Sequence, residues 1–213
     1  MKKIIGTLGI VFFVSAVVFG QGFKVKATGN QTFNFVSKDQ RNQTSFFSAM
    51  PVEDIRGLAA GVEGNISFDV KNVASTLKGK ITIATASIKT GIDLRDEHMR
   101  SAGWLDAEKY PEISFTIKKV SDVKSEADNK IKAKVSGDFT LRGVTKEVVT
   151  EATLTYLDES EKTKMRAPGD LLGIQAEFDI KLSDYGVKND VIGNKVADNI
   201  EIDVNIVGSN AAK

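Results

Sequence analysis

The sequence predicts one all-β domain, a single antiparallel barrel of about eight strands. Apolar and polar residues alternate with a period of two along six segments, as expected for strands with one buried face. These segments are residues 66–70, 113–118, 131–141, 148–156, 172–182 and 200–206. Weaker alternation adds candidate strands at residues 32–36, 45–49 and 77–86. No helical pattern is long enough to cover a parallel sheet, which argues against a fold of alternating strands and helices.

Closure into a barrel is the expected arrangement because it leaves no exposed sheet edges. The interior of an eight-stranded barrel is either filled by side chains or holds one small ligand. The predicted inward faces combine large aromatic residues with the small residues Ala133, Gly137, Ala152 and Ala176. This combination is compatible with tight interdigitation and with space for a guest, and the sequence leaves both open.

The first 20 residues have the layout of a secretory signal peptide. Two lysines precede an apolar segment at residues 4–19, and small residues follow at Gly20 and Gly22. The apolar segment is shorter than the roughly 20 residues of a membrane-spanning helix, which favours cleavage over a permanent anchor. We therefore expect a signal peptide at residues 1–20 and a domain at residues 21–213. The expected location is periplasmic or secreted, with no membrane span after cleavage.

The charge balance excludes several partners. Lys2 and Lys3 are the charged residues of the signal segment, so its removal reduces the 29 Lys and Arg to 27, against 28 Asp and Glu. A nearly neutral chain has no strong field of one sign, and we expect no nucleic-acid partner. The chain has no Cys, so its fold depends on the core and not on disulfides. A homodimer is compatible with this composition, which leaves the oligomeric state open.

A long charged connection joins the strands that precede residue 87 and follow residue 112. Hairpin loops usually take two to five residues, so a loop of about twenty needs a functional or capping explanation. The connection contains the only His and the only Trp of the chain, His98 and Trp104. Asp93 is a candidate N-cap for a short helix over residues 94–101, which would be stable only when packed against the sheet.

The sequence carries no catalytic or metal-binding constellation. A Ser/His/Asp triad has only His98 to use, and no Ser has the Gly-x-Ser-x-Gly context. A zinc site needs several His or Cys ligands. Acidic groups near Asp96 and Asp190 lack the glycine-punctuated spacing of a calcium loop. We expect no catalytic residue, no metal and no cofactor.

A barrel embedded in a membrane shows the same alternation with its faces inverted. Such barrels place Trp and Tyr in girdles at both strand ends, whereas this chain has one Trp and three Tyr. Its strand phenylalanines lie in the middle of the strands, at positions 68, 115, 139 and 178. The sequence therefore favours a barrel with an apolar interior.

Three ordered motifs carry a family resemblance. Residues 94–115 contain Arg-Asp-Glu-His-Met-Arg-Ser, then Trp-Leu-Asp, and Tyr-Pro directly before a strand. Residues 135–146 read Val-Ser-Gly-Asp-Phe-Thr-Leu-Arg-Gly-Val-Thr-Lys, and residues 182–187 read Leu-Ser-Asp-Tyr-Gly-Val. These motifs resemble the YceI-like family of exported, lipocalin-like proteins that bind polyisoprenoids or other long-chain amphiphiles. Residues 26–31 and 41–58 differ from the commonest members of that family.

The resemblance implies a lipocalin-like barrel that holds a long apolar tail in its interior. The inward-facing residues expected to line the tail are Phe33, Phe35, Phe68, Phe115, Phe139, Ile174 and Phe178. The long connection is expected to form a lid whose candidate contacts with the guest or its head group are Leu94, Arg95, His98, Met99, Arg100 and Trp104. Whether the three basic residues of this set meet a head group or pin the loop to the barrel is open at this point.

Two functions remain in view. The first is binding of a polyisoprenoid, an isoprenoid quinone or a fatty-acid-like lipid, for storage or transport in the cell envelope. The second is a structural or stress-response envelope protein with a filled barrel and no ligand. No set of catalytic residues in the sequence supports an esterase-like or isomerase activity, and we expect that the protein is not an enzyme.

Overall fold

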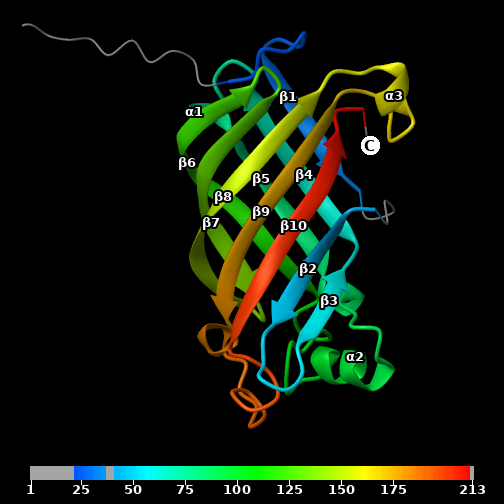
Figure 1. Ribbon diagram of the computed structural model, residues 1–213, viewed down its shortest axis with the longest axis vertical. Coiled ribbons are helices and arrows are strands. Elements are labelled where there is room, and N and C mark those ends of the chain that lie inside the picture. The colour runs from blue at the N-terminus through cyan, green and yellow to red at the C-terminus, as the bar shows by residue number, and fades with distance from the viewer. Residues whose placement is uncertain (1–21, 37–40, 212–213) are drawn as a thin grey trace, which may run out of the picture.

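The computed structural model describes residues 22–36 and 41–211, and its strands form one barrel (Figure 1). The strands are β1 (Asn30–Phe35), β2 (Gln43–Ser48), β3 (Ile55–Ala59), β4 (Val62–Asp69), β5 (Lys78–Ala84), β6 (Glu112–Ala127), β7 (Lys130–Leu141), β8 (Val144–Leu157), β9 (Leu171–Lys181) and β10 (Asn199–Ser209). The helices are short: α1 (Val73–Thr76), α2 (Asp93–Arg100) and α3 (Glu161–Lys164), with 3₁₀ turns η1 (Thr85–Ser87) and η2 (Leu182–Tyr185).

The expected signal peptide at residues 1–20 lies outside the described residues. Within residues 22–36 and 41–211, no helix has the length and apolar character needed to cross a membrane.

The strands close into an eight-stranded antiparallel barrel, which confirms the predicted fold class. β4 to β10 follow one another in the wall, and β10 pairs with β1 at Ser209, opposite Asn34. β10 also pairs with β2 along residues 201–205, so β1 and β2 together occupy one of the eight strand positions of the barrel. β4 pairs with β1 and β3 pairs with β2, so β4 and β3 together occupy the neighbouring strand position. A two-bond bridge between Leu58 and Lys89 joins β3 to the chain that follows β5.

The predicted inward faces are confirmed, most regularly in β7. All six residues of its predicted face are buried, and the residues between them are exposed or half-buried. The same alternation runs through β8, where Val148, Ala152, Leu154 and Tyr156 are buried. The apolar side of the wall therefore faces the interior, and the charged side chains lie outside.

The two-residue connection between β7 and β8 forms as predicted. Arg142 and Gly143 have positive φ angles of 51° and 73°, as in the type I′ turns that match the twist of a hairpin. The Arg142 guanidinium donates to the carbonyl oxygens of Gly186 at 2.8 Å and Ala102 at 3.1 Å. One side chain thus ties this hairpin to two neighbouring loops.

One end of the barrel is filled by aromatic side chains. Phe23, Phe33, Phe68 and Tyr156 are buried, and their neighbouring ring centroids lie 5.4 to 5.7 Å apart. Stacked, tilted and edge-on pairs all occur within this cluster, as the ring quadrupoles favour. This end of the barrel is a packed core.

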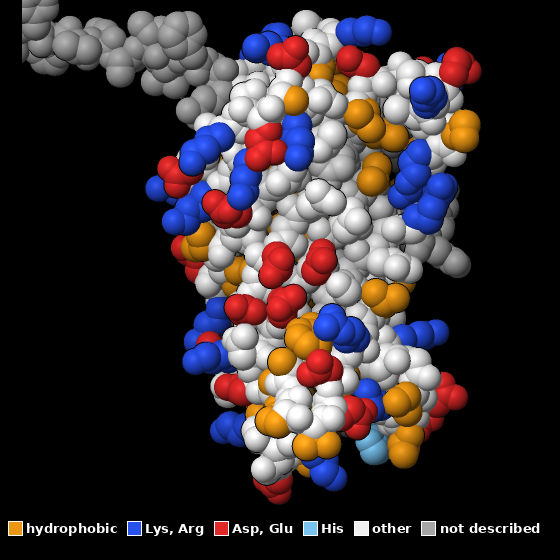
Figure 2. All heavy atoms as spheres, in the orientation of Figure 1, with side chains coloured by type: hydrophobic (Ala, Val, Ile, Leu, Met, Phe, Trp, Pro, Cys, Tyr) orange, Lys and Arg blue, Asp and Glu red, His pale blue; other side chains and the backbone are white. Residues whose placement is uncertain are grey.

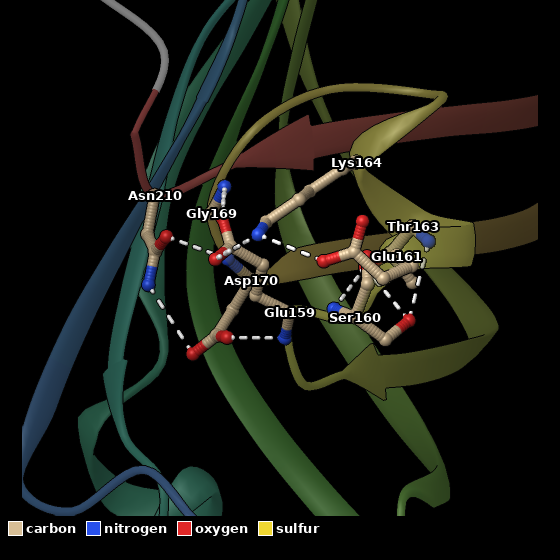
Figure 3. Close-up of polar contacts among 8 residues, drawn as sticks. All are labelled: Glu159, Ser160, Glu161, Thr163, Lys164, Gly169, Asp170 and Asn210. Atoms are coloured by element: carbon tan, nitrogen blue, oxygen red, sulfur yellow. Dashed lines mark hydrogen bonds and ion pairs between the residues drawn. The ribbon is translucent and has the colours of Figure 1, made fainter.

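A polar network beside the aromatic cluster centres on Asp170 (Figure 3). Its carboxylate accepts hydrogen bonds from the Tyr156 hydroxyl at 2.6 Å and the Glu159 backbone N–H at 2.8 Å. The Asp170 N–H donates to the Asn210 side chain at 2.9 Å, and the Gly169 N–H donates to the Glu159 carboxylate. Burial and the bond to Asp170 raise the pKa of Tyr156, so its hydroxyl stays a donor. The network holds the β8–β9 connection against the end of β10.

Both ends of the described chain lie at this filled end (Figure 1). The Phe23 N–H donates to the Val70 carbonyl at 2.7 Å, and the Asn210 N–H donates to the Asp170 carbonyl at 3.1 Å. The opposite end carries α2 and the β2–β3 hairpin.

Two local features differ from the sequence predictions. Asp93 is the first residue of α2 and not its N-cap; Ile92 holds the cap position without a side-chain hydrogen bond. β3 was not predicted, because Gly57 interrupts its apolar alternation. The Phe46 ring covers this glycine, and a Cβ there would lie 2.2 Å from it.

We expect the Tyr156→Phe substitution to lower the free energy of unfolding by about 1–3 kcal/mol, since it removes a donor to a carboxylate at the packed end. Urea denaturation of the purified protein measures this loss. Tyr110→Phe is the control, because its hydroxyl has no hydrogen-bond partner among the described residues, and its effect should stay within about 0.5 kcal/mol. Equal losses in the two variants would contradict a stabilising role for the Tyr156–Asp170 bond.

Candidate binding cavity

The barrel is hollow at the end that carries α2. A cavity of about 800 Å³ opens between the β2–β3 hairpin, α2 and the loop of residues 186–198. Its wall is mainly apolar and includes Ile83, Ile113, Ile180, Ile200 and Ile202 from four strands. A cavity of this size lies within the range of small-molecule sites.

A smaller chamber of about 110 Å³ lies deeper in the barrel, towards the aromatic cluster. Five residues line both spaces, namely Thr44, Ile83, Ile113, Phe139 and Ile202. Phe139 and Phe178 meet edge to face with centroids 5.5 Å apart, and Phe115 lies 6.3 Å from Phe178. These three rings form a constriction between the outer cavity and the inner chamber.

The accessible surface of the inward residues supports a hollow interior at this level. Phe178, Ile202 and Val204 face inward on β9 and β10 but are only half-buried, whereas the inward residues at the aromatic end are fully buried. The inner chamber touches all three of these half-buried side chains. Part of their remaining accessible surface therefore faces the inner chamber.

The small inward residues have two different explanations. Gly137 accommodates a neighbour, because a Cβ there would lie 2.5 Å from the Phe115 ring. Ala133 belongs to the packed core. Ala152 and Ala176 line the inner chamber and leave space open. Interdigitation and empty volume therefore both occur, at different levels of the barrel.

The lid, residues 88–111, is fixed by hydrogen bonds to its own backbone and to the barrel. The Thr85 hydroxyl donates to the Tyr110 carbonyl at 2.7 Å, and the Thr85 N–H donates to the Pro111 carbonyl at 2.9 Å. Within the lid, Leu105 N–H donates to Met99 and Asp106 N–H donates to Ser101. The long connection is thus an ordered cap, which explains its length.

Asp96 is a buried carboxylate that holds the start of α2. It accepts hydrogen bonds from the Thr90 backbone N–H and from the Thr90 hydroxyl, both at 2.7 Å. Burial raises the pKa of Asp96, but the bonds from Thr90 and the positive charge of Arg100 lower it by more, so the pKa lies below its ordinary value. The carboxylate is a positioning group of the lid.

The three basic residues of the lid have different surroundings. Arg95 forms an ion pair of 2.7 Å with Glu53 of the β2–β3 hairpin, which joins two sides of the mouth. His98 lines the cavity, and its imidazole has no hydrogen-bond partner within the part of the chain that the structure describes. Arg100 lies near Asp96 and outside the cavity lining. Arg95 therefore pins the lid, and His98 is the basic residue of the lid that faces the cavity without a hydrogen-bond partner among the described residues.

The structure separates the predicted site residues into three groups. Leu94, Arg95, His98, Met99 and Trp104 line the outer cavity. Phe115, Ile174 and Phe178 line the inner chamber, and Phe139 lines both. Phe33, Phe35 and Phe68 line neither space, because they lie in the packed end of the barrel. The inward direction of these three residues was predicted, but their level along the barrel was not.

Sequence reasoning missed the part of the mouth that is formed outside the regular strands. Phe46, Ile55 and Ala59 of the β2–β3 hairpin line the cavity, as do Val191 and Val196 of the 186–198 loop. Ser48 binds this loop by accepting from the Ala197 N–H at 2.8 Å. Ile55 and Ala59 share one face of β3, but Gly57 between them hides this pattern in the sequence.

The chemistry of the cavity is that of apolar burial. Its polar lining includes His98, Asn189 and Lys195 on the lid and the 186–198 loop, and the hydroxyl residues Thr44, Ser45 and Ser48 of β2. No group of three or more His, Asp or Glu side chains that could hold a metal ion occurs in the described ranges.

Comparison with known families gives a match to the YceI-like domain over residues 25–208. The chain belongs to the YceI-like family. Protein YceI of Salmonella newport is 30% identical over 209 residues, which covers 97% of each chain. Protein YceI of Escherichia coli O6:H1 is 39% identical over 129 residues, and this match spans 61% of its length and 61% of this chain.

Solved structures share the YceI-like fold at lower identity. BcnA of Burkholderia cenocepacia aligns over 78% of this chain and 96% of its own, with a TM-score of 0.61 and 19% identity. A polyisoprenoid binding domain from Saccharophagus degradans aligns over 86% of this chain and 99% of its own, with a TM-score of 0.58 and 15% identity. These structures confirm the lipocalin-like barrel.

We expect Asp96→Ala to lower the free energy of unfolding by about 1–3 kcal/mol at pH 7, because it leaves the Thr90 donors without their acceptor. Asp93→Ala removes an exposed carboxylate from the same helix and is the control. Urea denaturation at several pH values measures both variants. A loss no larger than that of the control would contradict the positioning role of Asp96.

The pH dependence follows from the lowered pKa of Asp96. Its contribution is fully present above the ordinary Asp pKa of about 4 and is lost as the pH falls through the lower folded-state value. The stability difference between the wild-type protein and Asp96→Ala should therefore narrow below about pH 4. A difference that stays constant down to pH 2 would show that ionisation of Asp96 is not the cause.

Proposed function

We propose that this protein binds a long-chain amphiphile in its barrel, for storage or transport in the cell envelope. The observation that carries the proposal is the apolar cavity of about 800 Å³, open at the α2 end and bounded by a packed aromatic cluster at the other. The guest class is a polyisoprenoid, an isoprenoid quinone or a fatty-acid-like lipid.

Apolar burial is sufficient for such binding. Each methylene removed from water contributes about 0.8 kcal/mol, before the cost of ordering the ligand is subtracted. A wall of isoleucine, leucine and phenylalanine can bind an apolar tail without specific hydrogen bonds or ion pairs. The proposed role is therefore non-catalytic binding.

The arrangement of polar groups favours one orientation of the guest. His98 and Lys195 lie at the mouth, while the inner chamber has an almost wholly apolar lining. We place the head group at the mouth, near His98, and the tail along Phe139 towards Phe178. Arg95 is occupied by Glu53 in this arrangement and holds the lid.

The YceI-like family and the polyisoprenoid binding domain among the similar folds support a lipid partner. The signal-peptide pattern at residues 1–20 supports a periplasmic or secreted location for the domain of residues 21–213. The cavity favours this function over a ligand-free structural role with a filled barrel.

Organic extraction of the purified protein, followed by mass spectrometry, tests the proposal directly. We expect a long-chain lipid to co-purify, and the fluorescent fatty acid cis-parinaric acid to bind and be displaced by isoprenoid alcohols. Phe178→Asp should abolish both signals, since it places a carboxylate in the apolar constriction. Val149→Asp, on the exposed outer face of β8, is the matched control.

Because a buried charge can prevent folding, Ala59→Trp is the second variant. It fills the outer cavity without adding a charge and should weaken probe binding at least about tenfold. Folding of each variant is checked by circular dichroism. A folded wild-type protein that yields no lipid and binds no probe would overturn the proposal.

The inner chamber predicts a dependence on tail length. Ala176→Phe fills this chamber, so binding of the longer alcohol geranylgeraniol should weaken about tenfold while binding of the shorter farnesol changes little. Competition against cis-parinaric acid gives both affinities. Equal weakening of the two alcohols would show that the tail does not reach beyond the constriction.

A further inference from the structure

Exposed apolar side chains gather at the mouth of the cavity. Seven large hydrophobic residues of the described chain are exposed, and four of them lie on the segments around the mouth. They are Val52, Leu58, Ile92 and Leu94, with exposed fractions of 98%, 47%, 49% and 62%. Figure 2 shows hydrophobic side chains beside the single His at this end of the molecule. We call these four residues the apolar rim.

The contacts of neighbouring residues bring the rim together. Val52 precedes Glu53 and Leu94 precedes Arg95, and the ion pair between those two charges has a length of 2.7 Å. Leu58 forms its two backbone hydrogen bonds with Lys89, three residues before Ile92. Two segments that are distant in the sequence, the β2–β3 hairpin and the start of the lid, thus present apolar side chains on one side of the mouth.

The rim is continuous with the interior of the barrel. Ile92 and Leu94 are exposed to solvent and also line the outer cavity. An apolar surface therefore extends from the outside of the protein through the mouth to the isoleucine wall. A lipid tail following this surface would remain in apolar contact throughout its passage.

We propose that the apolar rim docks on the surface of a lipid bilayer, so that the cavity opens towards the acyl chains. This inference rests on the proposed function, since the bilayer is the source or destination of the guest. Exposed apolar patches on soluble proteins mark interaction sites, and shallow insertion of a few apolar side chains is a recognised mode of membrane association. The continuity with the cavity favours a bilayer over a protein partner.

The charges around the rim define the kind of lipid surface. Glu53 and Asp93 carry negative charge beside the rim, and Lys89 and Arg95 carry positive charge. With both signs present, no strong attraction to anionic head groups arises. Docking should therefore depend on apolar insertion and only weakly on anionic lipid or ionic strength.

The test uses Val52→Asp combined with Leu58→Asp, because neither residue lines the cavity. Met165→Asp is the matched control, since Met165 is 83% exposed and follows α3 at the opposite end (Figure 1). Vesicles of phosphatidylcholine, with and without phosphatidylglycerol, are sedimented with each protein. Transfer of cis-parinaric acid from the same vesicles to the protein is followed by fluorescence.

We expect the double variant to lose about tenfold in vesicle binding and in transfer rate, while Met165→Asp behaves like the wild-type protein. Equilibrium binding of cis-parinaric acid added without vesicles should be unchanged in the double variant. If the wild-type protein does not bind cis-parinaric acid in solution, the proposed function is contradicted. Vesicle sedimentation tests the docking proposal independently of this result.

Three results would overturn the docking proposal. The first is a wild-type protein that does not bind vesicles. The second is vesicle binding that requires phosphatidylglycerol and is unaffected by the double variant. The third is transfer that is equally fast in the double variant and the wild-type protein. Binding of a protein partner to the rim, in the absence of vesicle binding, would also overturn the proposal, because the rim would then be a protein-binding surface.

Discussion

Closure of the barrel is the constraint on which the rest of the structure depends. Eight paired positions fix the circumference, so each level of the interior has a set volume and the inward side chains decide whether it is filled. At one end Phe33, Phe68 and Tyr156 occupy that volume together with Phe23. Further along, Ala152 and Ala176 leave part of it open. A filled core and a ligand cavity thus arise in one barrel from side-chain size alone.

The lid solves a different problem, because an eight-residue helix has little stability of its own. Its position is set by polar contacts among residues that do not line the cavity: Asp96 with Thr90, Thr85 with the Tyr110 carbonyl, and Arg142 with the Ala102 carbonyl. These bonds hold the lid in place through residues outside the cavity lining. The apolar side chains of α2 and of the residues after it are left to face the cavity.

The sequence was most informative where the pattern was local. Strict alternation located β7 to β10 and their inward faces, and Arg142-Gly143 located a hairpin. It could not locate the depth of Phe33 and Phe68, because depth depends on strand register and tilt across the whole barrel. It also missed β3, where Gly57 breaks the pattern to admit the Phe46 ring. The role of Arg95 required a partner, Glu53, that lies 42 residues away.

The position of the chain ends has a practical consequence. The first and last described residues both lie at the packed end, on the far side of the aromatic cluster from the cavity. A surface, a fluorophore or a second protein attached at the first or last described residue would lie at the packed end, away from the open end. Attachment at this end of the barrel would therefore orient the immobilised protein with its cavity facing the solution.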